Sequence, residues 1–319
     1  MSDSSHAPLA DPSPAESPPA WIVTGPTSGI GRHTAVELAG RGTVVLVGRD
    51  PKKLEAVAAE IRGRRGRAVC VVADFSDITS VRRAATQIIA LDLPLAGLVN
   101  NAGIMQAGDS RTTEGWDLVF ATNHLGPFAF TEALQAHLLD GANVLFVCSS
   151  TEDPTLRPAQ VAGFRGGRYI SAEASSRGVF EPGGAKRPSL DAYATSKQCN
   201  LATVLALART TTRLRFTAIE PGFNPGSNLS RRSGAVVHFL GKYVLSPLAP
   251  FIKHWSTPER AGQMIARILT DSASTTGVYY DEKGVPMTGS TQVSEPAFQD
   301  RVVAETRALL AAALTGPTL

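Results

Sequence analysis

The stretch Ala20-Trp21-Ile22-Val23-Thr24-Gly25-Pro26-Thr27-Ser28-Gly29-Ile30-Gly31 predicts a buried strand, a glycine-rich turn and a helix that runs on through Leu38 and Ala39. The apolar run has the length of a strand, and helical spacing of apolar residues begins directly after the last glycine. Glycines permit a tight turn and let a pyrophosphate approach the N–H groups at a helix start. The spacing is Gly-x-x-x-Gly-x-Gly, so a purely structural turn is the alternative, but the position after a first strand favours nucleotide binding.

Outward from this stretch, apolar runs and helical segments alternate along the chain. Further strands are predicted at 43–47, 68–73, 95–99, 143–148, 216–219 and, at the sheet edge, 278–280. Helices are predicted at 77–91, at 113–139 with a kink near Pro127, at 190–213, from Thr257-Pro258-Glu259 onward and at 298–314. Alternation of this kind is typical of one doubly wound parallel α/β sheet, in which ligands bind beyond the carboxyl ends of the strands.

Composition limits the classes of function. The chain has 319 residues and a formal net charge of +3, with its basic residues dispersed, so we expect no nucleic acid partner. Its three cysteines show no metal-ligand spacing, so we expect no metal, and they suit a reducing compartment. The most apolar stretch, 234–255, is interrupted by His238, Lys242 and Lys253, so we expect no transmembrane segment, a cytoplasmic location and at most contact with a membrane surface.

Two domain boundaries follow from the same survey. Residues 1–19 are rich in Pro, Ser, Ala and Asp and lack the apolar core of a secretory signal, so we expect a disordered tail. Residues 20–319 then form one Rossmann-type domain.

The end of the second predicted strand indicates which nucleotide is bound. Asp50 followed by Pro51 suits an N-cap and first helical position, so helix capping is the plain interpretation of Asp50. In a dinucleotide fold this strand end faces the adenosine ribose, where an acid accepts from a free 2′-OH and an arginine pairs with a 2′-phosphate. Arg49 at this position, with Arg32 beside the glycine turn, favours NADP(H) over NAD(H); the alternative is two merely exposed arginines.

Polar residues follow the next three strands. Asp74-Phe75 ends the third strand, where the carboxylate either accepts from an adenine amino group or is an ordinary loop acid. Asn100-Asn101-Ala102-Gly103 ends the fourth strand and Ser149-Ser150 the fifth, where a hydroxyl can face the same cleft. Asn123 lies inside the predicted helix 113–139, and a buried asparagine there requires hydrogen-bonding partners.

The stretch Tyr193-Ala194-Thr195-Ser196-Lys197 lies in the predicted helix 190–213. Residues four positions apart share one helix face, so a phenol and an ammonium stand together. A positive charge within about 4–6 Å favours the phenolate, which predicts that Tyr193 donates and accepts protons near neutral pH. Alone, the spacing favours a solvated face carrying a snorkelling lysine, and only the rest of the chain reverses that preference.

Taken together and in order, these motifs resemble the short-chain dehydrogenase/reductase family over most of residues 20–313. The motifs are Thr24-Gly25-x-x-x-Gly29-x-Gly31, Asn100-Asn101-Ala102-Gly103, Asn123, Ser150, Tyr193-x-x-x-Lys197 and Pro221-Gly222. Segments 29–35, 123–128 and 193–200 are similar to the retinol dehydrogenase and light-dependent protochlorophyllide reductase branch. Cys199 stands where the protochlorophyllide reductases carry a cysteine and is expected to fill core space.

The resemblance implies a catalytic tetrad. Tyr193 exchanges the proton with the substrate oxygen, Lys197 lowers its pKa and holds the nicotinamide ribose, Ser150 binds the carbonyl, and Asn123 positions a relay water. Ser150 is preferred to Ser149 for its position relative to the strand. The residues expected to contact NADP(H) are Gly25, Thr27, Ser28, Gly29, Ile30, Gly31, Arg32, Arg49, Asp74, Phe75, Asn101, Ala102, Gly103, Tyr193, Lys197, Pro221, Gly222 and Ser227, although Pro225-Gly226-Ser227 departs from the usual Thr pattern.

Two segments depart from the compact members of the family or line the cleft. Residues 151–191 form an insertion rich in Gly, Arg and Pro, whose arginines either face an acidic substrate or belong to a solvated loop: Arg157, Arg165, Arg168, Arg177 and Arg187. Residues 223–256 correspond to a substrate lid whose apolar character implies a bulky hydrophobic substrate, the alternative being packing on the core or a partner. Family members often form dimers or tetramers, so a homo-oligomer is expected unless the insertion blocks those surfaces.

Three hypotheses of function follow. The leading one is an NADP(H)-dependent oxidoreductase that moves a hydride between nicotinamide and a carbonyl or secondary alcohol of a bulky apolar substrate. The second is reduction of a carbon–carbon double bond, as in the protochlorophyllide branch. The third is a non-catalytic NADP(H)-binding scaffold or sensor, against which the complete tetrad argues.

Overall fold

The computed structural model describes residues 17–105, 109–223, 255–273 and 275–315. These residues form an eight-stranded sheet that is parallel except for its last strand. In sheet order the strands are β3 (Arg67–Val72), β2 (Thr43–Gly48), β1 (Ala20–Thr24), β4 (Leu95–Asn100), β5 (Asn143–Val147), β6 (Arg215–Ile219), β7 (Val278–Tyr280) and β8 (Pro286–Met287). The predicted doubly wound fold is confirmed.

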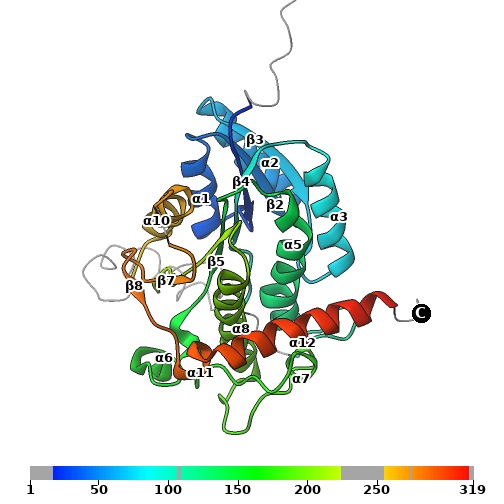
Figure 1. The fold of residues 1–319 in the computed structure, drawn as a ribbon, viewed down its shortest axis with the longest axis vertical. Helices are drawn as coiled ribbons and strands as arrows, with labels where there is room; N and C mark the ends of the chain where they lie inside the picture. Colours follow the sequence, from blue (N-terminus) through cyan, green and yellow to red (C-terminus); the bar gives the residue numbers. More distant parts are fainter. Residues whose placement is uncertain (1–16, 106–108, 224–254, 274, 316–319) are drawn as a thin grey trace, which may run out of the picture.

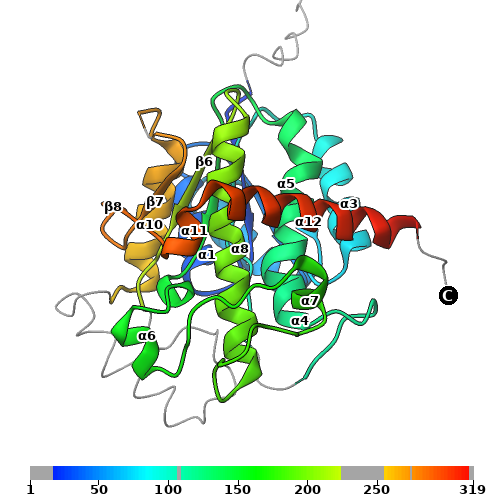
Figure 2. The ribbon, with the colours of Figure 1, turned by 60° about the horizontal axis from the view of Figure 1, so that its bottom comes forward.

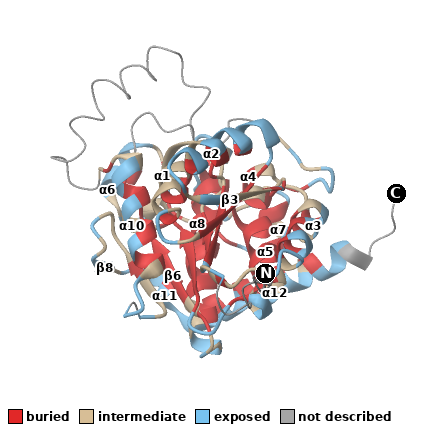
Figure 3. Cartoon of the chain, turned by 90° about the horizontal axis from the view of Figure 1, so that it is seen from above, coloured by how far each residue is buried: buried red, intermediate tan, exposed pale blue. Residues whose placement is uncertain are grey.

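Helices cover both faces of the sheet (Figure 1). On one face lie α1 (Gly29–Leu38), α2 (Pro51–Gly63) and α10 (Pro258–Thr270), and on the other lie α3 (Ile78–Ile89), α5 (Gly126–Leu134) and α8 (Pro188–Thr210). Successive side chains of a strand point to opposite faces, so each strand contributes to both cores. In β2, for example, Val44 and Leu46 pack under α2, while Val45 and Val47 pack toward α3. Figure 3 shows the buried strands between exposed outer helix faces.

The order of the strands places the candidate site. Strand β1 pairs with β2 on one side and with β4 on the other. The strands that follow β1 are thus added first on one side of it and then on the other, which makes the two sides of β1 a topological switch point. A crevice opens beyond the carboxyl ends of the strands at such a switch point. The glycine-rich turn after β1 and the turn after β4 therefore meet there.

The predicted helix 113–139 differs from the structure at its start and at its break. Residues 113–117 are not helical, because Gly115 has φ +79° and Asp117 caps the next turn by accepting from the Phe120 N–H at 2.8 Å. The helical region then consists of α4 (Leu118–Phe120), a π-helical turn η2 (Ala121–Leu125), α5 and a 3₁₀ turn η3 (Gln135–His137). The irregularity is thus the π turn before Pro127, which itself stands in the first turn of α5, where proline is tolerated.

The insertion is folded. It contains η4 (Ser150–Glu152), α6 (Arg157–Val161) and α7 (Ala172–Ser176), followed by the start of α8. Ser171 caps α7 by accepting from the Ala174 N–H at 3.0 Å, and Tyr169 is fully buried. The insertion thus combines short helices and a few buried side chains with exposed irregular stretches, and four of its five arginines, all but Arg168, are exposed.

The carboxyl-terminal region closes the sheet and crosses its helices. The predicted edge strand is β7, but β8 pairs with it and forms the actual edge. After α11 (Thr291–Ser294), α12 (Pro296–Thr315) lies across α8 and α5 (Figure 2). Within the described ranges, no helix combines the length and the apolar character needed to cross a bilayer.

Two predicted segments fall largely outside the described residues. Of the expected tail 1–19, only 17–19 are described, and the expected lid is described only at its ends. Phe223 and Trp255 join those ends through an isolated parallel bridge, and their rings meet edge to face with centroids 5.2 Å apart. Ser227 lies outside the described residues.

Candidate active site

Helix α8 carries Tyr193 and Lys197 on one face, one turn apart. The helix begins with Pro188 in its first turn and is buried through most of its middle, so packing rather than amphipathic patterning holds it. The Lys197 Nζ lies 5.6 Å from the centroid of the Tyr193 ring and donates a 2.7 Å hydrogen bond to the Val147 carbonyl at the end of β5. The solvated face considered for this motif is therefore wrong, because both side chains are buried.

The electrostatics of this pair differ from the expectation. Burial raises the pKa of Tyr193 well above its ordinary value, the charge of Glu220 acts in the same direction, and a hydrogen bond with Ser149 opposes both. Burial also lowers the pKa of Lys197, against the opposing charges of Cys148 and Glu220. The predicted lowering of the Tyr193 pKa is thus not seen, because desolvation of the phenolate is the larger effect. Tyr193 is consequently a proton donor over a wide pH range.

The two serines after β5 have different partners. The Ser149 side chain acts on Tyr193 by lowering the pKa of the phenol, and its Oγ accepts from the Thr151 hydroxyl at 3.1 Å. Both the N–H and the side chain of Ser150 are hydrogen-bonded to the Glu220 carboxyl. The carbonyl-binding role of Ser150 stays a prediction, and Ser149 is the serine that acts on the pKa of Tyr193. The 3₁₀ turn η4 begins at Ser150 and directs it toward the end of β6.

Asn123 stands in the π turn η2. Its Oδ1 accepts from the Ile104 N–H at 2.8 Å, and its Nδ2 donates to the Ile104 carbonyl at 2.9 Å and to Ser196 Oγ at 3.2 Å. Gly103 lies between it and Lys197, because a Cβ on Gly103 would be 3.4 Å from Asn123 Oδ1 and 3.8 Å from Lys197 Nζ. Asn123 therefore has the hydrogen-bonding reason that its burial requires, and it borders the same space as Lys197.

The glycine-rich turn fits a pyrophosphate. Gly25 and Gly29 have φ of +66° and +54°, and a Cβ on Gly29 would meet no atom within 4 Å, so its backbone faces open space. Ser28, the N-cap of α1, makes no side-chain cap bond, so the first N–H groups of the helix are available to an anion. Gly31 is required for close packing, since its Cβ would lie 2.4 Å from both Asn101 Nδ2 and the Gly25 carbonyl. Thr27 and Ile30 complete this turn, both half-buried.

Asn101 ties the two turns at the switch point together. Its Nδ2 donates to the carbonyls of Thr24 at 2.8 Å and Gly25 at 3.2 Å. Thr24 Oγ1 accepts from the N–H groups of Asn101 and Ala102, both at 2.9 Å. The side chain of Asn101 is thus used within the protein, and it shapes the crevice rather than facing it.

The residues expected at the adenosine end have mixed environments. Asp50 caps α2 by accepting from the Lys52 and Lys53 N–H groups at 3.1 and 3.2 Å, which confirms its plain interpretation. Arg49 is exposed at the end of β2, whereas Arg32 pairs with Glu60 at 2.6 Å. Of the two predicted arginines, Arg49 is the better placed for a 2′-phosphate.

The third strand end is mainly structural. Asp74 Oδ1 accepts from the N–H and the hydroxyl of Ser76 at 2.9 and 2.7 Å, as a loop acid does. Phe75 is buried against Phe130, with ring centroids 5.3 Å apart. Only the backbone of Phe75 is therefore available to a nucleotide.

Beyond β6, Pro221 and Gly222 are buried, and Gly222 has φ +77°. The Gly222 N–H donates to Glu220 Oε1 at 3.0 Å. Glu220, a carboxyl directly after a buried strand, is absent from the sequence-based set of site residues. A charged residue between an apolar strand and a Pro-Gly turn is the sequence signal that marks it.

The insertion supplies an apolar wall beside Tyr193. The rings of Phe164 and Tyr193 have centroids 6.0 Å apart, and both belong to a cluster with Val119, Ala159 and Leu190. Three insertion arginines have structural partners rather than facing an open site. Arg165 donates to the Phe164 carbonyl, Arg168 donates to the Pro182 and Gly183 carbonyls, and Arg177 pairs with Glu173.

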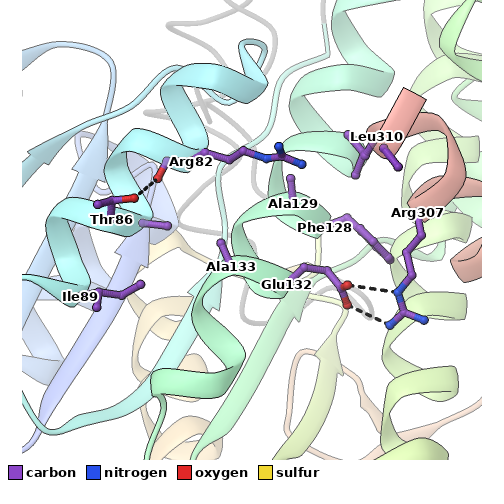
Figure 4. A pocket seen from close by; sticks show the side chains of 11 residues that line it. Arg82, Thr86, Ile89, Phe128, Ala129, Glu132, Ala133, Arg307 and Leu310 are labelled. Carbon is purple, nitrogen blue, oxygen red and sulfur yellow. Dashed lines mark hydrogen bonds and ion pairs between the residues drawn. The ribbon is translucent and has the colours of Figure 1, made fainter. Parts of the chain in front are cut away.

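A separate groove of about 470 Å³ lies between α3, α5 and α12 (Figure 4). Its lining is mostly apolar and includes the Glu132–Arg307 ion pair, in which the two nitrogen–oxygen distances are 3.1 and 2.9 Å. No predicted site residue lines it. No cluster of three metal-ligating side chains occurs in the described part of the chain.

Comparison with known proteins identifies relatives of this site and fold. The family described as short chain dehydrogenase matches residues 20–157. Retinol dehydrogenase 12 of Mus musculus is 40% identical over 124 residues, which cover 38% of this chain and 39% of that protein. DnrU of Streptomyces sp. (strain C5), for which daunorubicin C-13 ketoreductase activity is proposed, is 27% identical over 272 residues and 85% of each chain.

A solved structure shares the fold. A blue fluorescent protein from a metagenomic library, crystallised with NADPH, superposes with a TM-score of 0.61 at 23% identity, over 84% of this chain and 97% of that chain. The family match, the sequence similarity to retinol dehydrogenases and the strand order agree with one another. The chain is thus similar to the short-chain dehydrogenase/reductase family over residues 20–157 and to retinol dehydrogenase 12 over 38% of its length.

Proposed function

We propose that this protein is an NADP(H)-dependent oxidoreductase that transfers a hydride between nicotinamide and a carbonyl or secondary alcohol of a bulky apolar substrate. The observation that carries the proposal is the meeting of Tyr193, Lys197 and Ser149 beyond the end of β5. The apolar wall around Phe164 supports a hydrophobic substrate. The names of two relatives, which refer to retinol and to the C-13 ketone of daunorubicin, support the same class.

The cofactor half of the proposal rests on the glycine cradle and on Arg49. The open backbone at Gly29 and the uncapped start of α1 suit a pyrophosphate. Exposed Arg49 suits a 2′-phosphate, so we propose NADP(H) rather than NAD(H). When bound, this cofactor supplies the hydride. The NADPH held by the metagenomic blue fluorescent protein supports the choice.

The chain's own residues handle the proton. Burial raises the pKa of Tyr193, so the phenol carries its proton near neutral pH and is suited to protonating a carbonyl oxygen. Ser149 donates to the same oxygen and orients it. Lys197, anchored on the Val147 carbonyl, adds a positive charge beside the phenolate that forms. The apolar cluster excludes water from these groups.

Replacing Tyr193 by Phe tests the proposal. NADPH affinity, measured by fluorescence titration, should stay near that of the wild type, while carbonyl reduction falls by a factor on the order of 10² or more. Tyr280→Phe on β7 is the matched control and should keep its turnover. Retained turnover in Tyr193→Phe would remove Tyr193 from the mechanism.

Deuterated NADPH distinguishes the remaining functions. Carbonyl reduction places the label on the carbon that carries oxygen, whereas double-bond reduction places it on a carbon that does not. Tight NADPH binding without turnover of any compound in a broad carbonyl panel would instead support a scaffold or sensor. The cytoplasmic location and a homo-oligomeric state belong to the same proposal and are checked by cell fractionation and by sedimentation.

A further inference from the structure

Helix α8 carries a third polar residue on the face of Tyr193 and Lys197. The spacing Tyr193-x-x-x-Lys197-x-x-Asn200 keeps the three side chains in one row, because residues three and four positions apart share a helix face. Asn200 is 2% exposed, so its amide group needs partners inside the protein. Neither the proton transfer nor the binding of NADP(H) proposed above uses this side chain.

The Asn200 amide supplies a donor that the helical region before α5 lacks. In an α-helix the carbonyl of Asn123 would accept from the N–H of residue 127, but this residue is Pro127, which has no N–H. The Asn200 Nδ2 donates to the Asn123 carbonyl at 2.9 Å instead. The same stretch forms the π turn η2, in which the Gly126 N–H donates to the Ala121 carbonyl. A side chain of α8 thus completes the backbone hydrogen bonding of the turn that carries Asn123.

The other end of the Asn200 amide is held by His124. A backbone carbonyl can only accept, so Nδ2 faces Asn123, and Oδ1 faces the His124 Nδ1, 3.0 Å away. The His124 Nδ1 therefore carries a proton. Burial lowers the pKa of His124 to about 4, so near neutral pH the ring is uncharged, and its Nε2 accepts from the Thr306 hydroxyl at 3.0 Å. A buried chain of hydrogen bonds thus runs from α12 to the π turn and sets the orientation of Asn200.

The π turn determines where Asn123 lies relative to the catalytic face of α8. The Asn123 side chain binds both backbone groups of Ile104, in the segment that follows β4. It also donates to the Ser196 Oγ, and the Ser196 hydroxyl donates to the Tyr193 carbonyl at 2.7 Å. A shift of the turn would therefore move the groups that border Lys197 on both sides.

We propose that Asn200 is a positioning residue of the active site, which holds the carbonyl of Asn123 and thereby fixes the π turn beside Lys197. This inference rests on the proposed function, because it concerns the same site. The row on α8 then has three members, two that handle the proton and one that holds the facing wall. Such placement affects the rate, since a displacement of about 1 Å can slow a reaction about a hundredfold.

The Asn200→Leu variant tests this placement. Leucine fills the space but offers neither donor nor acceptor, so the π turn loses its tie to α8. We expect kcat for carbonyl reduction to fall between about tenfold and a hundredfold, while KM and NADPH affinity stay near those of the wild type. A change confined to kcat separates misplacement of the turn from a general loss of folded protein, which would not alter kcat per folded molecule.

Thr203→Val is the matched control. Thr203 is fully buried, and its hydroxyl donates to the Cys199 carbonyl at 2.8 Å, so the variant removes a buried hydrogen bond that stays within α8. It should keep its kcat. If Asn200→Leu does not fold, Asn200→Ser takes its place, because its hydroxyl bonds back to the preceding turn of α8 and is too short to hold the π turn. A wild-type kcat in the Asn200 variant, or equal losses in that variant and in Thr203→Val, overturns the proposal.

A second measurement needs no turnover. With ¹⁵N-labelled histidine, the ring of His124, assigned by His124→Gln, should show the Nδ1–H tautomer in the wild type and in Thr203→Val. In Asn200→Leu no side chain accepts from Nδ1, whereas the Thr306 hydroxyl can accept from Nε2, so the ring should change to the Nε2–H tautomer. The Nε2–H tautomer in the wild type, or an unchanged ring in Asn200→Leu, overturns the inference. The expected tautomers without turnover of any carbonyl compound would reject the proposed function but keep the hydrogen-bond chain.

Discussion

At the scale of single residues, the chemistry of the site is set by how deeply its groups are buried. Tyr193 is 9% exposed, so its phenolate form would be poorly solvated. The neighbouring ammonium of Lys197 does not compensate for this loss of solvation. Lys197 is driven toward its neutral form by the same burial. A phenolate is therefore not the resting state of Tyr193. The protonated phenol is, and it suits the reduction of a carbonyl.

The two serines after β5 allow a sharp test at this scale. Ser149 acts on the pKa of Tyr193, whereas Ser150 is hydrogen-bonded to Glu220, so their substitutions should act differently. We expect Ser149→Ala to lower kcat about tenfold or more with little change in melting temperature, because it removes a hydrogen bond made to the reacting oxygen. Ser150→Ala should mainly lower the free energy of unfolding, by about 1 kcal/mol, because the side-chain hydrogen bond to Glu220 is lost. The hydrogen bond from the Ser150 N–H to Glu220 persists and keeps the turn in place. Steady-state kinetics and thermal unfolding of both variants check this, and the reverse pattern would restore the role to Ser150.

At the scale of elements, the glycine turn is held by contacts that leave no room for a side chain. A Cβ on Gly31 would lie 2.4 Å from Asn101 Nδ2 and the Gly25 carbonyl, closer than real contacts permit. We expect Gly31→Ala to weaken NADPH binding at least about tenfold, since the turn or the start of α1 must shift at a cost of about 1–3 kcal/mol. Fluorescence titration with NADPH measures the effect.

Gly63→Ala provides the control for that substitution. Gly63 is the last residue of α2, and a Cβ there would meet no atom within 4 Å. Unchanged NADPH affinity and equal or higher stability are expected, because alanine is the better helix former. Equal NADPH affinity in wild type and Gly31→Ala would show that the turn does not form the cradle.

Most elements could be predicted because buried parallel strands are written as continuous apolar runs. The runs at 43–47 and 95–99 correspond to β2 and β4 within one residue. The capping of α2 by Asp50 and of α10 by Thr257 could also be predicted, because a capping motif involves only residues that are neighbours in the sequence. Glycine and proline spacing likewise placed the turn after β1.

What could not be predicted depends on contacts between distant segments. The start of the helix after Trp116 depends on a hydrogen bond from the Asp117 N–H to the Ser176 carbonyl in the insertion. The partner of Ser150 is Glu220, 70 residues away in the chain. The raised pKa of Tyr193 is a property of burial, which no local spacing reveals.

At the scale of the whole molecule, the carboxyl-terminal helices α11 and α12 form hydrogen bonds to the insertion and to the π-helical turn η2. Glu305 of α12 accepts from the Tyr169 hydroxyl at 2.7 Å, and Thr306 lies 3.0 Å from His124 Nε2 in the π turn. Glu152, in η4, is bonded to Ser290 at the start of α11. The surface pair Glu132–Arg307 beside the groove adds little to stability in comparison, because exposed ion pairs contribute about 0–1 kcal/mol.

Two groups in these contacts, Glu152 and His124, change stability with pH in opposite directions. Burial raises the pKa of Glu152 from 4.5 to about 7, so its contribution to stability is full below pH 4.5 and is lost as the pH rises toward 7. Burial lowers the pKa of His124 from 6.5 to about 4, so its contribution is full above pH 6.5 and is lost as the pH falls toward 4. Each shift corresponds to a change on the order of 3 kcal/mol. The two slopes cancel in the window where both groups titrate, between the ordinary values of 4.5 and 6.5.

Single substitutions should therefore uncover a pH dependence that the wild type hides. In Glu152→Gln only the histidine contribution remains, and the free energy of unfolding should rise with pH by about 1.4 kcal/mol per unit between the two ordinary values. In His124→Gln only the carboxyl contribution remains, and the free energy should fall with pH at the same rate. Urea unfolding of the three proteins at a series of pH values measures these slopes. Parallel curves for wild type and both variants would mean that neither group keeps its buried, uncharged form in the folded protein, since a group that titrates as it does in water contributes no slope.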